Sequence, residues 1–169
     1  HILTAAHCVF AKHRHPTRFR IDYASLTVRN GTQVRVKSIA VYPEYSPPQI
    51  YHDIAMLKLA EPIQFSDIVQ PICLPGKGML GDKMINQSAF VAGYGDTSFG
   101  GKAAKSLQLV KLDILENSYC NKNYRKLADA QTKFANGIGK NLICAGYKQG
   151  GKDACQVSSF FYGLHDKFF

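Results

Sequence analysis

Three short motifs carry ionisable side chains that could do chemistry. They read LTAAHC, DIAML and KDACQ, and they contain His7, Asp53 and Asp153 respectively. An imidazole can take a proton from a hydroxyl that attacks a carbonyl, and a carboxylate can hold the ring in the required tautomer. In this order the three side chains predict most of a site that cleaves peptide bonds.

Short β-rich segments, bounded by turn residues, must position these side chains. The best helix candidate is residues 118–130, where Tyr124 and Leu127 have i,i+3 spacing. Asn30-Gly31 predicts a two-residue hairpin turn between two strands. Many short strands and few helices indicate an all-β sandwich or barrel, with strands predicted at residues 18–22, 25–28, 32–36, 39–42, 54–59, 89–92 and 107–115.

Length and charge limit the classes of protein. At 169 residues the chain can build one sizeable core or two small ones. It contains no uninterrupted apolar run near 18 residues, so we expect no membrane span. The net charge of +9 comes from scattered positives without a nucleic-acid-binding motif. We therefore expect no nucleic acid partner, and the basic surface leaves affinity for acidic glycans or lipids open.

The chain has five widely spaced cysteines, and none belongs to a C-x-x-C pair that would suggest zinc or a redox site. Their odd number predicts a partner outside the chain. Asn30 and Asn86 begin glycosylation sequons, which are compatible with export. The glycines at 76–81 fit G-x-G-x-x-G, but they follow a proline loop, so we predict no cofactor. His13 and His15 lack further ligands, so we predict no metal.

Several motifs in a fixed order resemble those of the trypsin-like (chymotrypsin-fold) serine proteases. They are TAAHC at 4–8, DIAMLKL at 53–59, PICLP at 71–75, GYG at 93–95, NLICAG at 141–146 and DACQ at 153–156. The resemblance implies an all-β fold of two barrels, incomplete at both termini, with one short helix in the second half. It divides the chain into a partial N-terminal barrel (1–72), a linker (73–88), a partial C-terminal barrel (89–156) and a divergent, aromatic-rich tail (157–169).

The resemblance also implies a role for each site residue. His7 would be the general base, and Asp53 would orient its ring and stabilise the imidazolium. Asp153 would lie at the base of the primary specificity pocket and pair with a Lys or Arg side chain of a polypeptide substrate. The alternatives are a core histidine with satisfied hydrogen bonds, an ordinary loop aspartate and a surface aspartate between two turns.

The nucleophile position departs from the family pattern. The family continues with Gly-Asp-Ser-Gly-Gly-Pro, whereas this chain reads VSSFF at 157–161. Ungapped counting places Ser159 on the nucleophile. Glycines there let the backbone turn sharply and point N–H groups at the oxyanion, and Val157, Phe160 and Phe161 would resist that geometry. The sequence therefore disfavours Ser159 as a working nucleophile.

The resemblance assigns the cysteines as well. It implies a disulfide between Cys120 and Cys144, a partner for Cys8 before His1 and a partner for Cys155 after Phe169. Cys73 in many secreted relatives tethers the catalytic domain to a propeptide or regulatory module. We therefore expect a secreted, extracellular protein made as a zymogen.

Two hypotheses follow. In the first, the chain is an incomplete or inactive version of a trypsin-like endopeptidase that cleaves after Lys or Arg. In the second, it is a non-catalytic protease homologue that acts as a binding or regulatory partner, as the residues at 157–161 would suggest.

Overall fold

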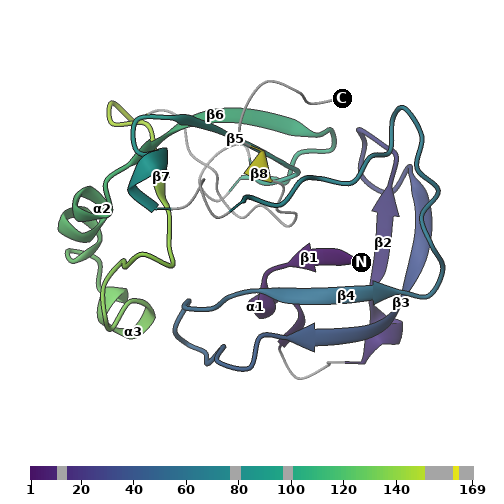
Figure 1. Cartoon of the computed structure of the whole chain (residues 1–169), viewed down its shortest axis with the longest axis horizontal. Coiled ribbons are helices and arrows are strands. Elements are labelled where there is room, and N and C mark those ends of the chain that lie inside the picture. Colours follow the sequence, from purple (N-terminus) through teal and green to yellow (C-terminus); the bar gives the residue numbers. More distant parts are fainter. Residues whose placement is uncertain (11–14, 77–80, 97–100, 151–161, 164–169) are drawn as a thin grey trace.

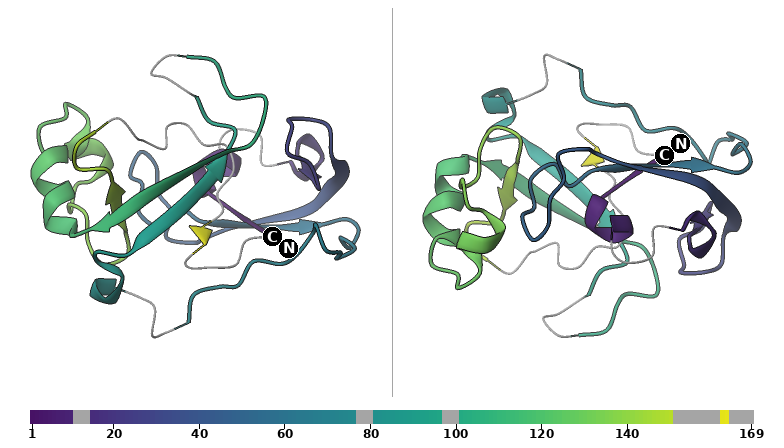
Figure 2. Two further views of the ribbon diagram at one scale, coloured as in Figure 1. Left: turned by 90° about the horizontal axis from the view of Figure 1, so that it is seen from above. Right: turned by 90° about the horizontal axis from the view of Figure 1, so that it is seen from below.

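Two four-stranded antiparallel sheets form the body of the protein (Figure 1). The computed structural model describes residues 1–10, 15–76, 81–96, 101–150 and 162–163. The helices within this part of the chain are short, so the all-β prediction is confirmed. Viewed from above and below, the long strands of the two sheets run at an angle to each other (Figure 2).

The first sheet has the order β1-β4-β3-β2. Its strands are β1 (Ile2–Thr4), β2 (Arg20–Tyr23), β3 (Thr32–Val41) and β4 (Ala55–Leu59). The ten-residue β3 pairs with β2 through its first half and with β4 through its second half. A register shift between Val36 and Ser38 lies between the two pairings. Such irregularities increase strand bending, and the sheet curls at this point (Figure 1).

Apolar side chains of this sheet alternate with exposed ones and build a core against α1 (Ala6–Phe10). In β3, Val34 and Val36 are buried while Arg35 between them is exposed. This is the period-2 pattern of a strand with one buried face. The buried core residues are Ala6, Val9, Val36, Tyr45, Ala55 and Leu57.

The predicted hairpin at Asn30-Gly31 is wrong in its first strand. Residues 25–28 form no strand, and the partner of β3 is β2, so the connection spans residues 24–31. Glycine is needed at position 31 because the backbone there lies close to Asp22 and Tyr23, not because it forms a two-residue turn. A Cβ atom there would lie 2.1 Å from Asp22 Oδ1 and 2.2 Å from the Tyr23 carbonyl oxygen, so only glycine fits.

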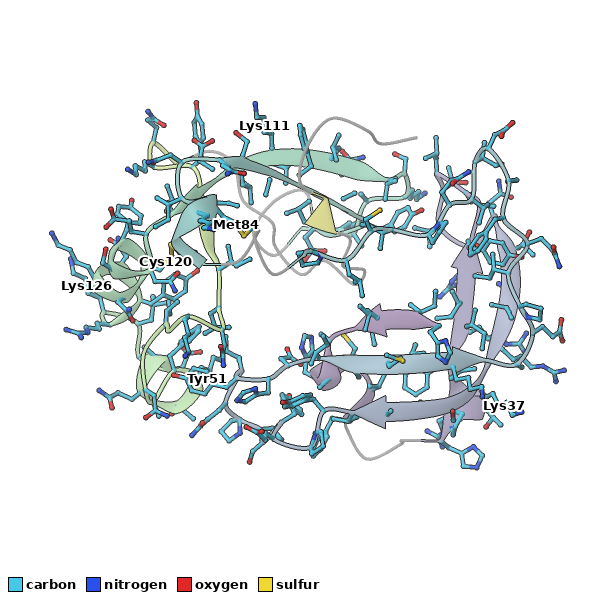
Figure 3. The ribbon with its side chains drawn as sticks, viewed as in Figure 1. Lys37, Tyr51, Met84, Lys111, Cys120 and Lys126 are labelled. Atoms are coloured by element: carbon cyan, nitrogen blue, oxygen red, sulfur yellow. A yellow bond between two sulfur atoms is a disulfide. The ribbon has the colours of Figure 1, made fainter. Side chains whose placement is uncertain are left out.

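The second sheet has the order β7-β6-β5-β8. Its strands are β5 (Ser88–Gly93), β6 (Gln108–Leu115), β7 (Cys144–Gly146) and β8 (Tyr162–Gly163). A short 3-10 turn, η3 (Gly81–Met84), precedes β5 and delivers Met84 to a small core with Ala89 and Ile114 (Figure 3). This core is smaller than that of the first sheet.

The predicted helix at 118–130 is divided in two. The observed helices are α2 (Asn117–Tyr124) and α3 (Ala130–Lys133), and a further 3-10 turn, η1 (Pro16–Arg18), lies in the first half. No residue of α2 is buried, so no apolar stripe continues the helix through residue 130. The disulfide Cys120–Cys144 instead joins α2 to β7, as the resemblance implies. The proposed division into barrels, linker and tail stays a prediction.

The β4 strand offers a matched test of the core. We expect Leu57→Ala to lower the free energy of unfolding by about 3 kcal/mol, because Leu57 is buried and its loss leaves a cavity. Met56 precedes it on the opposite face and is 44% exposed, so Met56→Ala should cost less than about 1 kcal/mol. Urea unfolding of both variants measures the difference. Equal losses would show that β4 does not face the core as described.

Candidate active site

Antiparallel pairing of β1 with β4 brings His7 and Asp53, two of the predicted site residues, together. Thr4 lies opposite Ala55 at the end of β1 and the start of β4. His7 follows Thr4 by three residues, in the first turn of α1, and Asp53 precedes Ala55 by two. Because the strands run in opposite directions, the exit of one and the entry of the other share one edge of the sheet. The pairing thus closes a sequence gap of 46 residues.

Asp53 contacts His7 through both carboxylate oxygens. The distance from His7 Nδ1 to Asp53 Oδ2 is 2.6 Å, and the backbone N–H of His7 donates to Asp53 Oδ1 at 2.8 Å. A carboxylate oxygen accepts here, so Nδ1 is the donor, and in the neutral imidazole with this tautomer the lone pair is on Nε2. The second bond satisfies a backbone donor in the first turn of α1. Together they fix both the ring and the backbone of His7 against Asp53.

The exposure of the pair is asymmetric. The side chain of His7 is 57% exposed and that of Asp53 is 20% exposed. More of the imidazole than of the carboxylate is therefore in contact with solvent. Such a ring can accept a proton from a group that approaches from outside.

The Cys8 thiol lies beside the free ring nitrogen, with Cys8 Sγ 3.4 Å from His7 Nε2. Loss of hydration around the sulfur raises the pKa of Cys8 above its usual value, and the Asp53 carboxylate raises it further. The thiol form is thereby favoured, and its S–H can donate to Nε2. Cys8 is a free cysteine in this structure.

Tyr45 lies beneath the site and was not predicted from the sequence. Its ring is buried and meets Phe10 edge-on, with centroids 5.1 Å apart. Burial raises the pKa of Tyr45, and the charges of Asp53 and Cys8 add to this shift. A tyrosine just before a proline pair carries no local signal of burial. Only the packing of α1 onto β3 and β4 reveals it.

The contacts that hold the turn before Asp53 were also not predicted from the sequence. His52 has a left-handed backbone (φ 56°), and its ring stacks on Tyr42 with centroids 5.3 Å apart. His52 Nε2 lies 3.4 Å from Glu44 Oε2. The Tyr51 hydroxyl reaches the segment after α3, where it donates to the Gly137 carbonyl at 2.6 Å. These contacts set the direction in which Asp53 leaves the turn.

Comparison with known proteins agrees with the all-β fold. The family model described as Trypsin matches residues 1–159. The chain belongs to the trypsin family of serine proteases. It is a serine endopeptidase by family, and the two curled sheets fit the all-β, two-barrel fold of that family.

Relatives from arthropods share a third of the residues. Venom serine protease Bi-VSP of Bombus ignitus is 36% identical, over 94% of this chain and 43% of its own length. Serine protease snk of Drosophila melanogaster is 35% identical, over 94% of this chain and 35% of its own length. Clotting factor G beta subunit of Tachypleus tridentatus is 30% identical, over 94% of this chain and 52% of its own length. The chain thus spans about half, or less, of the length of these trypsin-family relatives.

Asp153, Cys155 and Ser159 lie outside the described residues. Cys73 is an exposed, free cysteine. The structure thus brings together His7 and Asp53, and their catalytic roles stay predictions.

A hollow of about 390 Å³ lies beside the turn that precedes Asp53. One wall holds Glu44, Tyr51 and His52, and the other is formed by residues 136–142 of the second half. The hollow therefore lies at the meeting of the two halves of this trypsin-family chain.

Within the described part of the chain, no group of three or more His, Cys, Asp or Glu side chains is arranged to hold a metal ion. No helix in the same residues is long and apolar enough to cross a membrane.

The proximity of Asp53 to Cys8 predicts a change in thiol reactivity. Replacing Asp53 with Asn removes a charge that raises the pKa of Cys8, so the pKa should fall and the thiolate fraction at pH 8 should rise. The rise should be a small factor, because the loss of hydration remains. We therefore expect iodoacetamide to label Cys8 faster in the variant. Peptide mass mapping distinguishes the labelling of Cys8 from that of Cys73.

Asp129→Asn is the matched control. Asp129 pairs with Lys133 near α3 and is not among the groups that shift Cys8. It should leave the labelling rate of Cys8 unchanged. Slower labelling in Asp53→Asn would contradict the described geometry.

Proposed function

We propose that this chain comes from the catalytic domain of a secreted trypsin-like endopeptidase that is made as a zymogen. The observation that carries the proposal is the hydrogen bond between His7 Nδ1 and Asp53 Oδ2 at 2.6 Å. In the neutral imidazole it leaves the lone pair on Nε2, beside the Cys8 thiol, and this nitrogen can act as a base. The match to the trypsin family over residues 1–159 supplies the class of reaction.

In the proposed reaction His7 takes the proton of the Ser159 hydroxyl while its oxygen attacks the scissile carbonyl of a polypeptide. The imidazolium that forms is stabilised by Asp53, which contacts both the ring and the backbone of His7. His7 then returns the proton to the leaving amine, and water releases the acyl group by the same steps. No metal or cofactor takes part in this scheme.

We further propose that Asp153 sets the preference for Lys or Arg at the cleavage position. A carboxylate at the end of a confined pocket pairs with an ammonium or guanidinium group and rejects neutral side chains. The support is the register fixed by the DACQ motif at 153–156.

Secretion and tethering have separate support. The disulfide Cys120–Cys144 is typical of oxidising compartments. Asn30 and Asn86 of the two sequons are exposed, so both are accessible to glycosylation. The exposed thiol of Cys73 is available to bind a propeptide or regulatory module. A zymogen with an attached module accounts for these features together.

A fluorophosphonate probe tests the catalytic role, because it labels only an activated serine. The catalytic proposal requires labelling at Ser159 in spite of the residues at 157–161, and it requires that His7→Ala and Ser159→Ala each lower the labelling rate by about 10³-fold or more. Mass spectrometry of the labelled peptide identifies the residue. Circular dichroism of each variant confirms that the fold is retained.

The second candidate is a non-catalytic protease homologue that binds a partner. It is favoured by the residues VSSFF at 157–161, which lack the glycines that shape an oxyanion site. A folded chain that the probe does not label would contradict the catalytic proposal and support this candidate. Its partner would then be sought by its affinity for the folded chain.

Specificity offers a further test of the first proposal. We expect Asp153→Ser to lower kcat/KM for a peptide with Arg at the cleavage position by about 100-fold or more, because it removes one partner of a buried charge pair. Lys152→Ser is the matched control at the neighbouring position and should keep the preference for Arg. Steady-state rates on two peptides that differ only in Arg or Ala at the cleavage position measure this preference. Equal loss on both peptides would assign Asp153 to folding instead.

A further inference from the structure

We propose that Tyr51 is a positioning residue that couples the loop after α3 to the His7–Asp53 pair. The inference rests on the proposed role of His7 as the base. Its basis is the short path from the Tyr51 hydroxyl, which is held by the second half of the chain, to the carboxylate that orients the imidazole.

The Tyr51 hydroxyl makes two hydrogen bonds to backbone groups far away in the sequence. It donates to the Gly137 carbonyl oxygen at 2.6 Å and accepts from the backbone N–H of Asn136 at 2.9 Å. The neighbouring N–H of Ile50 donates to the Lys133 carbonyl at 3.2 Å. Tyr51 is partly buried and lies beside α3 (Figure 3). The turn before Asp53 is thus attached to the second half at consecutive residues.

The loop that receives Tyr51 is itself held firmly by α2. The Asn121 side chain accepts from the Ile138 N–H at 2.7 Å and donates to the Ile138 carbonyl at 3.0 Å. Gly137 has φ 69° and leaves no room for a Cβ atom, which would lie 2.8 Å from Asn121 Oδ1. Since α2 also carries the disulfide to Cys144, the partners of Tyr51 are fixed to a cross-linked unit.

The path from Tyr51 to the active-site carboxylate is one residue long. His52 lies between them with a left-handed backbone, and its carbonyl accepts from the Ile54 N–H at 2.7 Å. Stacking on Tyr42 and the contact with Glu44 hold its ring. A backbone constrained on both sides transmits a displacement of Tyr51 to Asp53. A change of a few tenths of an ångström is enough to weaken a hydrogen bond of 2.6 Å.

The test removes only the hydroxyl, with Tyr51→Phe. The readout is the proton on His7 Nδ1. Its downfield ¹H NMR signal is observed in the folded chain labelled with ¹⁵N at histidine. We expect this proton to exchange with solvent about five- to tenfold faster in the variant, because the loss of a hydrogen bond of ordinary strength loosens Asp53. Where the chain hydrolyses peptide, kcat should fall with KM unchanged.

Tyr94→Phe is the matched control. The Tyr94 hydroxyl also joins the two halves, donating to the Ser25 carbonyl at 3.0 Å. That contact belongs to a second junction between the two halves. There the Val28 N–H donates to the Lys105 carbonyl, and the Leu107 N–H donates to the Leu26 carbonyl. This junction and that of Tyr51 lie on opposite sides of the molecule (Figure 1). Tyr94→Phe should leave the exchange of the His7 proton unchanged.

The outcomes separate positioning from general stability and from catalysis. Unchanged exchange in Tyr51→Phe would overturn the proposal, as would equal acceleration in both variants, or an unmodified chain that shows no protected His7 proton. The measurement does not involve Ser159. Faster exchange in Tyr51→Phe alone would therefore support the positioning role even if the fluorophosphonate probe failed to label the chain.

Discussion

The pairing of β1 with β4 is the constraint on which the site depends. The register that sets Thr4 against Ala55 fixes where α1 begins and where the turn before β4 ends. A slip of one residue would turn each side chain to the other face of the strand and would separate His7 from Asp53. The buried residues Ala55 and Leu57 hold this register, because their face of β4 meets the core. Core packing and active-site geometry therefore have the same origin.

Asp53 serves structure and chemistry together. One oxygen satisfies the N–H of His7 at the start of α1, and the other orients the imidazole. The same charge raises the pKa of Cys8 and of Tyr45, so its influence extends to both sides of the site. A carboxylate with this many neighbours requires a firmly placed backbone, and the bonds of Tyr51 and His52 supply it from two directions.

Polar and covalent links organise one part of the second half of the chain. No side chain of α2 is buried. The disulfide Cys120–Cys144 and the amide side chains of Asn117 and Asn121 instead join α2 to the segment between α3 and β7. The loop that these links hold presents backbone groups to Tyr51.

The sequence by itself determined the strand-rich architecture, the resemblance to trypsin-like proteases and the candidates His7 and Asp53, because alternating apolar residues and short motifs are local signals. The tertiary structure decided the rest. It paired β3 with β2 rather than with residues 25–28, ended α2 at Tyr124, buried Tyr45 and joined Tyr51 to Gly137. Each of these depends on contacts between residues far apart in the chain, and local propensity carries no information about such partners.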